Sequence, residues 1–139
     1  MRNYRLYLIR HGITSGNLEG KYIGTTDLPL CEEGVDAISS LVALDVYPHV
    51  QKVYSSPLKR CLETADIIYP ERLLKRIDGI AEMDFGEYEG KTHEELSADK
   101  DYIEWLKGGY EAADTGGERL GHFNIRCIDG IEEILKDMM

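Results

Sequence analysis

Short apolar runs alternate with amphipathic stretches along the chain. Residues 3–10 form a nearly continuous apolar run, which is typical of a strand buried on both faces of a parallel sheet. Runs at residues 52–56 and 72–77 predict a second and a third strand. Strands that alternate with helices favour an α/β fold, in which a mainly parallel sheet lies between two helical layers as a three-layer αβα arrangement.

Apolar residues recur at helical spacing in the stretches between and after these strands. We expect one helix over residues 33–46, a second that follows Pro57, and a third that begins near Leu120 and runs to the end of the sequence. Ser56 and Pro57 have the residue types of an N-cap and of a first helical position.

The length of 139 residues predicts a single domain over residues 1–139. Residues 78–118 form a long stretch rich in glycine and acidic residues, in which "YIEWL" at 102–106 predicts a short helix. A helix packed on a parallel sheet normally leads to another strand, whereas this sequence ends at Met139, directly after its last predicted helix. We therefore expect a C-terminally incomplete domain whose sheet lacks a strand.

Composition and charge narrow the classes of partner. The 42% of hydrophobic and 30% of charged residues are ordinary for a globular domain, and the net charge of −10 argues against nucleic acid or a membrane surface as a partner. No apolar run is long enough to cross a membrane, so we expect a cytoplasmic location. The three cysteines lack metal-ligand spacing and are odd in number, which predicts reduced thiols. An anionic ligand would have to be bound by a local group of basic residues.

The first predicted strand leads directly into Arg10, His11 and Gly12. Adjacent Arg and His side chains at the end of a buried strand are costly to desolvate unless an anion binds there. A neutral histidine beside a glycine can approach a phosphorus atom as a nucleophile, and the nearby Asn17 can donate a hydrogen bond to the transferred group. This segment therefore predicts a site that handles phosphate.

Two further segments lie where the other predicted strands end. The helix after Pro57 offers free backbone N–H groups to a phosphate, and Arg60 adds a guanidinium fork in its first turn. Glu82 follows the third strand, and a carboxyl group there can protonate a leaving oxygen and then activate water. Ligands of open parallel sheets bind beyond the carboxyl ends of the strands, so we expect the three segments to converge. Together they predict phosphoryl transfer through histidine.

Each of these motifs has an ordinary structural explanation when it is taken alone. A histidine after a strand is more often a surface residue than a nucleophile, Arg60 alone would be a solvated helix charge, and Glu82 is one of 26 acidic residues. Polar and glycine residues in the loops also serve turns, and this applies to Asn17 and Gly24. The co-occurrence of the motifs at one edge of the sheet favours a site. The other three histidines lack such a context and are expected to be structural: His49, His93 and His122.

With these motifs in place, the sequence resembles the histidine phosphatase superfamily in its phosphoglycerate mutase-like branch. "LIRHGITSGN" is similar to the family's signature, "GKYIGTTDLPLCEEGVDA" to the segment that follows it, "SSPLKRCLETA" to the second motif and "EMDFGEYEGKTHEEL" to the third. The resemblance implies that His11 is phosphorylated during catalysis and that Glu82 is the proton donor. The residues implied to bind the substrate phosphate are Arg10, Asn17, Gly24 and Arg60. No cofactor and no metal ion is implied.

The resemblance implies a phosphomonoester hydrolase that acts through phosphohistidine on a small phosphorylated metabolite. "YIGTTDLPL" and the short connection before "DFGEYEG" are similar to small phosphatases of the α-ribazole phosphatase type. Two other functions stay open: a phosphoglycerate mutase-type phosphotransferase, and a catalytically impaired phosphate-binding or interaction protein. The organic part of the substrate is expected to contact residues 18–30 and 78–118, where Tyr88, Tyr102 and Trp105 either line a pocket or belong to the core.

The sequence departs from the family in several places. The family has Thr or Ser at the position of Cys31, where a thiol is a poor N-cap for the following helix. Gly130 is expected to weaken the last helix by about 1 kcal/mol relative to alanine. The resemblance also implies a further strand, ending in a second histidine, between the first and second predicted strands. Without it we expect a gap in the middle of the sheet, reduced activity and, because strand edges are exposed, association into a homo-oligomer.

Overall fold

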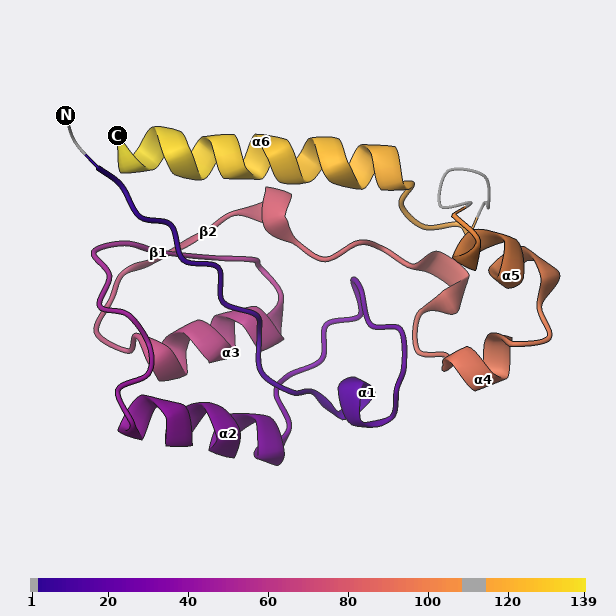
Figure 1. Cartoon of the computed structure of the whole chain (residues 1–139), viewed down its shortest axis with the longest axis horizontal. Coiled ribbons are helices and arrows are strands. Elements are labelled where there is room, and N and C mark those ends of the chain that lie inside the picture. Colours follow the sequence, from indigo (N-terminus) through magenta and orange to yellow (C-terminus); the bar gives the residue numbers. More distant parts are fainter. Residues whose placement is uncertain (1–2, 109–114) are drawn as a thin grey trace.

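The computed structural model describes residues 3–108 and 115–139, and it has an α/β fold with helices on both sides of a small sheet (Figure 1). In Figure 1, α6 lies along one side, α2 and α3 lie on the other, and α4 and α5 form a separate group at one end. The strands are β1 (Val53–Ser55) and β2 (Leu74–Arg76). The helices are α1 (Ser15–Leu18), α2 (Glu32–Ala43), α3 (Lys59–Ile68), α4 (His93–Leu96), α5 (Lys100–Leu106) and α6 (Leu120–Met138). Two 3-10 turns, η1 (Asp78–Ile80) and η2 (Gly86–Tyr88), follow β2.

The two strands pair in parallel, with Val53 beside Leu74 and Ser55 beside Arg76. The second and third predicted strands are therefore confirmed in shortened form. The first prediction is wrong, because residues 3–10 pass the sheet without forming a strand and are exposed. A strand needs a neighbour for its backbone hydrogen bonds, and neither strand of the described chain pairs with this segment.

A cavity of about 670 Å³ is lined by residues 3–9 and by residues 49–56. Ile68 of α3 and Ile131 and Ile134 of α6 contribute apolar walls. The cavity lies between the N-terminal segment and β1, where the gap was expected, but because residues 3–10 form no strand it lies beside the two-stranded sheet and not in its middle. Since β1 pairs only with β2 in the described part of the chain, its other edge faces away from β2 without a strand beside it.

The long helix α6 packs its inner face on η1. Ile134 is buried, whereas Ile128 and Leu135 of the predicted apolar face are exposed. Gly130 lies so close to Gly79 that a Cβ atom on Gly130 would be 2.9 Å from the carbonyl carbon of Gly79. The glycine expected to weaken the helix is therefore what allows the helix to pack closely. None of the helices in residues 3–108 and 115–139 is long and apolar enough to cross a membrane.

The carboxylate of Asp137 attaches the C-terminal end of α6 to the sheet. It accepts hydrogen bonds from Lys52 Nζ at 2.8 Å, Tyr54 Oη at 2.6 Å and Lys75 Nζ at 3.3 Å. The bonds from Lys52 and Tyr54 contribute most to lowering the pKa of Asp137. Tyr54 is in β1 and Lys75 is in β2, so one side chain holds the helix end across both strands.

The N-terminal ends of α2 and α3 test two predictions about helix caps: that Cys31 caps α2 poorly, and that α3 starts at Ser56 and Pro57. Cys31 is the N-cap of α2, but its thiol donates to the Ile13 carbonyl at 3.3 Å instead of accepting a backbone N–H group. α3 begins at Lys59, so the predicted start at Ser56–Pro57 is wrong. The carboxylate of Asp27 accepts the Lys59 N–H group at 2.7 Å, and a side chain from a distant loop therefore caps this helix.

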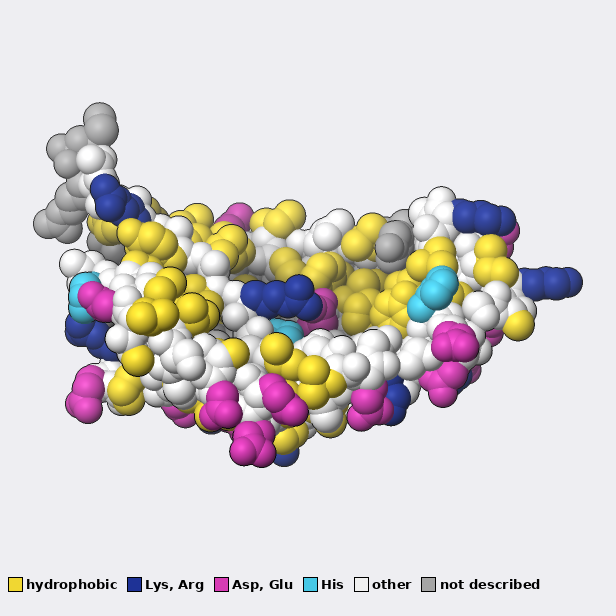
Figure 2. Space-filling view, turned by 60° about the horizontal axis from the view of Figure 1, so that its bottom comes forward, with side chains coloured by type: hydrophobic (Ala, Val, Ile, Leu, Met, Phe, Trp, Pro, Cys, Tyr) yellow, Lys and Arg dark blue, Asp and Glu magenta, His cyan; other side chains and the backbone are white. Residues whose placement is uncertain are grey.

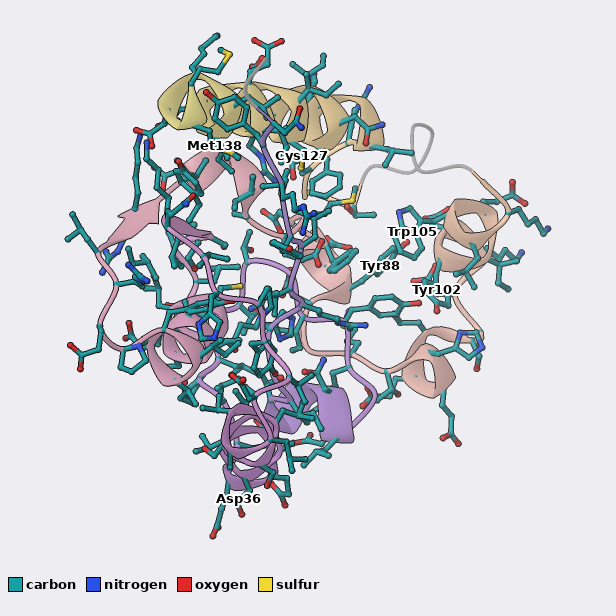
Figure 3. The ribbon with its side chains drawn as sticks, turned by 60° about the vertical axis from the view of Figure 1, so that its left-hand side comes forward. Asp36, Tyr88, Tyr102, Trp105, Cys127 and Met138 are labelled. Atoms are coloured by element: carbon teal, nitrogen blue, oxygen red, sulfur yellow. The ribbon has the colours of Figure 1, made fainter. Side chains whose placement is uncertain are left out.

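Three aromatic side chains form the core of the group made by η2, α4 and α5, and Figure 3 shows them facing one another. Tyr88, Tyr102 and Trp105 are almost fully buried. The Tyr102 hydroxyl lies 2.7 Å from the Tyr22 hydroxyl and 2.7 Å from His93 Nδ1. Of the two interpretations of these aromatic residues, the core is the correct one, and His93 has the structural role that we expected.

Candidate functional site

His11 lies where the N-terminal segment enters the loop before α1. Its Nδ1 atom is 2.7 Å from the Gly12 carbonyl oxygen, and because a carbonyl only accepts, Nδ1 carries the proton. Nε2 of the neutral ring therefore holds a lone pair. Burial lowers the pKa of His11 most, and the charges of Arg60 and Arg10 lower it further, against the opposing effects of the Gly12 hydrogen bond and Glu82. The neutral ring is thus the main form at pH 7.

Thr64 of α3 holds the backbone beside His11. Its Oγ1 atom accepts the Gly12 N–H group at 2.9 Å and donates to the Arg60 carbonyl oxygen at 2.6 Å. A Cβ atom on Gly12 would lie 2.4 Å from Cδ1 of Ile38, so α2 leaves little room for a larger residue there. Sequence reasoning missed Thr64, although its position four residues after Arg60 places both on one side of a helix.

The guanidinium of Arg60 is buried, with 1% of the residue exposed. Nη2 donates to the Gly24 carbonyl at 2.7 Å and Nη1 donates to the Thr26 carbonyl at 3.1 Å. Nε has no hydrogen-bond partner among the described residues. Two neutral carbonyl groups do not balance a buried positive charge, so this guanidinium favours an anion next to it.

Arg10 and Glu82 also lie close enough to His11 to shift its pKa, Arg10 downwards and Glu82 upwards. Both side chains are exposed. Glu82 Oε1 accepts the Met83 N–H group at 2.8 Å, which leaves the other carboxylate oxygen for a further contact. Figure 2 shows basic, acidic and histidine side chains meeting in a hollow in the middle of one face. The predicted convergence of the three segments is therefore seen around His11.

Arg126 of α6 holds the segment that leads to Glu82. Its Nη1 atom donates to the carbonyl oxygens of Gly79 and Ala81, each at 3.0 Å, and Nη2 approaches that of Glu82 at 3.4 Å. The same guanidinium forms a two-point ion pair with Glu118 at 2.7 and 2.8 Å. Sequence reasoning missed this residue, because an arginine on a long helix has no local signal of the carbonyl groups that it contacts.

Asn17 in α1 and Gly24 in the following loop, both predicted to bind substrate, have hydrogen bonds within the chain. The side-chain oxygen of Asn17 accepts the N–H and hydroxyl groups of Thr14, the N-cap residue of α1, and completes a capping box there. The carbonyl of Gly24 accepts from Arg60, as described above, and a Cβ atom there would lie 1.9 Å from the Met83 carbonyl oxygen. Gly24 therefore positions Arg60 within the described structure.

The start of α3 differs from the predicted phosphate site. The carboxylate of Asp27 accepts the Lys59 N–H group, so an anion of the chain itself is bound at this helix end. The positive end of the helix dipole attracts negative charge, and a carboxylate satisfies it as a phosphate would. The prediction that this helix start offers free N–H groups to substrate is therefore wrong for Lys59.

The fold and the group around His11 agree with the comparisons to known proteins. The chain belongs to the histidine phosphatase superfamily (branch 1), whose sequence model matches residues 6–138. It is 31% identical to the adenosylcobalamin/alpha-ribazole phosphatase of Salmonella typhimurium, over 88% of this chain and 62% of that relative. It is 32% identical to phosphoserine phosphatase 1 of Hydrogenobacter thermophilus, over 95% of this chain and 64% of that relative.

A solved structure of a phosphatase has a similar fold. The alpha-ribazole phosphatase of Shigella flexneri superposes with a TM-score of 0.81 and 27% identity, over 94% of this chain and 66% of that one. The resemblance seen in the sequence motifs is therefore confirmed. The chain spans somewhat less than two thirds of the length of these relatives.

Proposed function

We propose that this chain hydrolyses phosphomonoesters of small molecules through a phosphohistidine formed at His11. The observation that carries the proposal is the state of the His11 ring: its Nδ1–H group is held by the Gly12 carbonyl, and two arginines and one glutamate lie close enough to shift its pKa. A neutral imidazole next to two positive charges combines a nucleophile with groups that attract a phosphate. The names of the phosphatase relatives support the same reaction class.

In the first step, the lone pair of His11 Nε2 attacks phosphorus and forms an N–P bond while the ester P–O bond breaks. The departing oxygen takes its proton from the Glu82 carboxyl group. Arg10 and Arg60 bind the equatorial oxygens of the phosphoryl group, whose charge is spread over them in the transition state. The hydrogen bond from Nδ1 to Gly12 stabilises the positive charge that develops on the ring.

In the second step, the Glu82 carboxylate takes a proton from water, and the water oxygen attacks phosphorus. The N–P bond breaks, inorganic phosphate forms, and the electron pair returns to Nε2. Glu82 thus acts first as acid and then as base, and the enzyme is restored. In this proposal the Asn17 amide nitrogen donates to the phosphoryl group, while Gly24 acts through Arg60.

The cavity beside the sheet favours a second candidate, phosphate binding with little or no turnover. His11 is among the residues that line this cavity, so one side of the nucleophile is open. Water on that side weakens the electrostatic contribution of the arginines, because their charges act in a higher dielectric. A third candidate is phosphoryl transfer, since the 2,3-bisphosphoglycerate-dependent phosphoglycerate mutase of Rhizobium etli is a relative at 29% identity.

The test measures release of inorganic phosphate from an aryl phosphate, with a chelator present, by the wild type and by His11→Ala. His49→Ala is the matched control, because His49 is an exposed histidine outside the site. Hydrolysis requires turnover in the wild type and in His49→Ala, loss in His11→Ala, and an acid-labile phosphoryl label on His11. Binding of phosphate without turnover favours the binding protein, and transfer to a second substrate without net release favours the transferase. Equal turnover in all three proteins would contradict the mechanism.

A further inference from the structure

Glu89 is another carboxylate of the third motif, and the proposed mechanism does not use it. It follows η2 and is partly buried. Its Oε1 atom accepts the backbone N–H groups of Gly24 and Thr25 at 3.0 Å and that of Phe85 at 3.1 Å. Its Oε2 atom accepts the Thr26 hydroxyl at 2.5 Å and the Thr26 N–H group at 3.3 Å. One side chain thus binds three successive amides of a loop that lies more than sixty residues away in the sequence.

The opposite side of the same loop holds Arg60. The amides of residues 24–26 point to the Glu89 carboxylate, while the carbonyl groups of Gly24 and Thr26 point to the Arg60 guanidinium. Peptide dipoles are stabilised when their N–H ends face a negative charge and their C=O ends face a positive charge. The loop is therefore held between two opposite charges, and each charge stabilises the orientation that the other requires.

The loop is closely packed at Gly24, against Met83 and Glu89. A Cβ atom on Gly24 would lie 1.9 Å from the Met83 carbonyl oxygen and 2.4 Å from Glu89 Oε1. Burial acts to raise the pKa of Glu89, but the hydrogen bonds from Thr26, Phe85, Gly24 and Thr25 outweigh it and the net shift is downwards. Glu89 is therefore ionised at neutral pH, which is the form that this loop requires.

We propose that Glu89 is a positioning residue that orients Arg60 toward the substrate phosphate through the loop of residues 24–26. Without the carboxylate, the N–H groups of the loop lose their common acceptor, and the loop can rotate its carbonyl groups away from the guanidinium. Arg60 then loses the two contacts that fix its direction. Glu89 touches neither substrate nor His11 in this proposal, which rests on the proposed phosphate site.

The first test is binding of inorganic phosphate by the whole chain, measured by calorimetry for the wild type, Glu89→Gln and Glu87→Gln. Glutamine has nearly the same shape as glutamate, but it turns an N–H₂ group toward backbone N–H groups. We expect Glu89→Gln to weaken phosphate binding about tenfold, the size expected for loss of a charge-assisted hydrogen bond, and to raise the KM for an aryl phosphate. The exposed neighbour Glu87 makes a matched control, and Glu87→Gln should bind phosphate as the wild type does.

The second test separates positioning from a general loss of structure. If Glu89 acts through Arg60, Glu89→Gln should add little to the loss already caused by Arg60→Lys, because lysine lacks the fork that contacts both carbonyl groups. An equal loss in the wild-type and Arg60→Lys backgrounds would overturn the proposal, and so would unchanged binding in Glu89→Gln. If Glu89→Gln does not fold, Thr26→Val removes one contact to the carboxylate and should weaken binding about twofold, and no change would count against the proposal.

These outcomes are distinct from a failure of the proposed function. If the wild type neither binds nor hydrolyses phosphate esters, the phosphate site itself is wrong, and the Glu89 proposal falls with it. If the wild type binds phosphate and Glu89→Gln binds it equally well, only the positioning role is wrong.

Discussion

Replacing Thr64 by valine tests whether the His11 segment depends on α3. Valine matches threonine in shape but has no hydroxyl, so Thr64→Val removes the acceptor of the Gly12 N–H group and the donor to the Arg60 carbonyl. Each of these bonds contributes about 1 kcal/mol, and the partly buried Gly12 N–H group is left without its acceptor. We expect the free energy of unfolding to fall by about 2 kcal/mol.

The matched variant is Thr64→Ser, which keeps the hydroxyl and removes one methyl group. Loss of that methyl costs about 1 kcal/mol, so Thr64→Ser should be the more stable of the two variants. Urea unfolding can be followed by the emission of Trp105, the single tryptophan of the chain, and checked by far-ultraviolet circular dichroism. Both signals should give the same order: wild type, Thr64→Ser, Thr64→Val.

The same pair should differ in turnover. Gly12 carries both the N–H group bound by Thr64 and the carbonyl that holds His11 Nδ1, so Thr64→Val should loosen His11, the proposed nucleophile. A displacement of about 1 Å lowers a rate by about 100-fold, and we expect a 10- to 100-fold lower kcat in Thr64→Val with a near-normal kcat in Thr64→Ser. If the serine variant is as slow and as unstable as the valine variant, the hydroxyl does not hold this segment and the reasoning is refuted.

Three further predictions concern pH, the proton donor and helix packing. Because burial lowers the pKa of His11 and attack requires the neutral ring, the acid limb of kcat/KM should have its midpoint below pH 6.5, and a midpoint above 6.5 in a pH profile would contradict this. Glu82→Gln should slow an alkyl phosphate much more than a p-nitrophenyl phosphate, because only the poor leaving group needs a proton; equal losses in the two assays would exclude the acid role. Gly130→Ala should lower stability by about 1–3 kcal/mol in thermal unfolding although alanine favours helices, since its Cβ would press on Gly79; a stabilised variant would show that this contact relaxes freely.

Local sequence patterns predicted the helices better than the strands. The helical periodicity around α2 and α6 depends on the residues of each helix alone, and both helices are present close to the expected bounds. The apolar run at residues 3–10 predicts a strand equally clearly, but a strand also requires a hydrogen-bonding neighbour. The cavity beside β1 lies where such a neighbour would be, and the segment therefore has no strand structure.

In the candidate site, too, the sequence predicted some residues and missed others. The chemistry proposed for the site is visible in the residue types of Arg10, His11, Arg60 and Glu82, and the structure brings these four residues together. The residues that hold them were missed: Thr64, Arg126 and Glu89. Each of them contacts backbone groups 40 to 65 residues away, and because any polar side chain can contact a backbone group, the sequence carries no signal for these distant pairings.

The same supporting contacts show that the two halves of the site have unequal stability. Arg60 is held by a closed arrangement in which the carbonyl and N–H groups of residues 24–26 are bound between the guanidinium and Glu89, and the cavity beside β1 does not border any of these residues. His11 does border that cavity, and its ring has one hydrogen bond among the described contacts, to the Gly12 carbonyl, while the Gly12 N–H group bonds to Thr64. We therefore expect the open cavity to affect mainly the orientation of the His11 ring, and not that of Arg60. In the proposed mechanism the arginines bind phosphate, whereas turnover also requires an aligned Nε2, so we expect the open side of the sheet to lower kcat more than phosphate affinity.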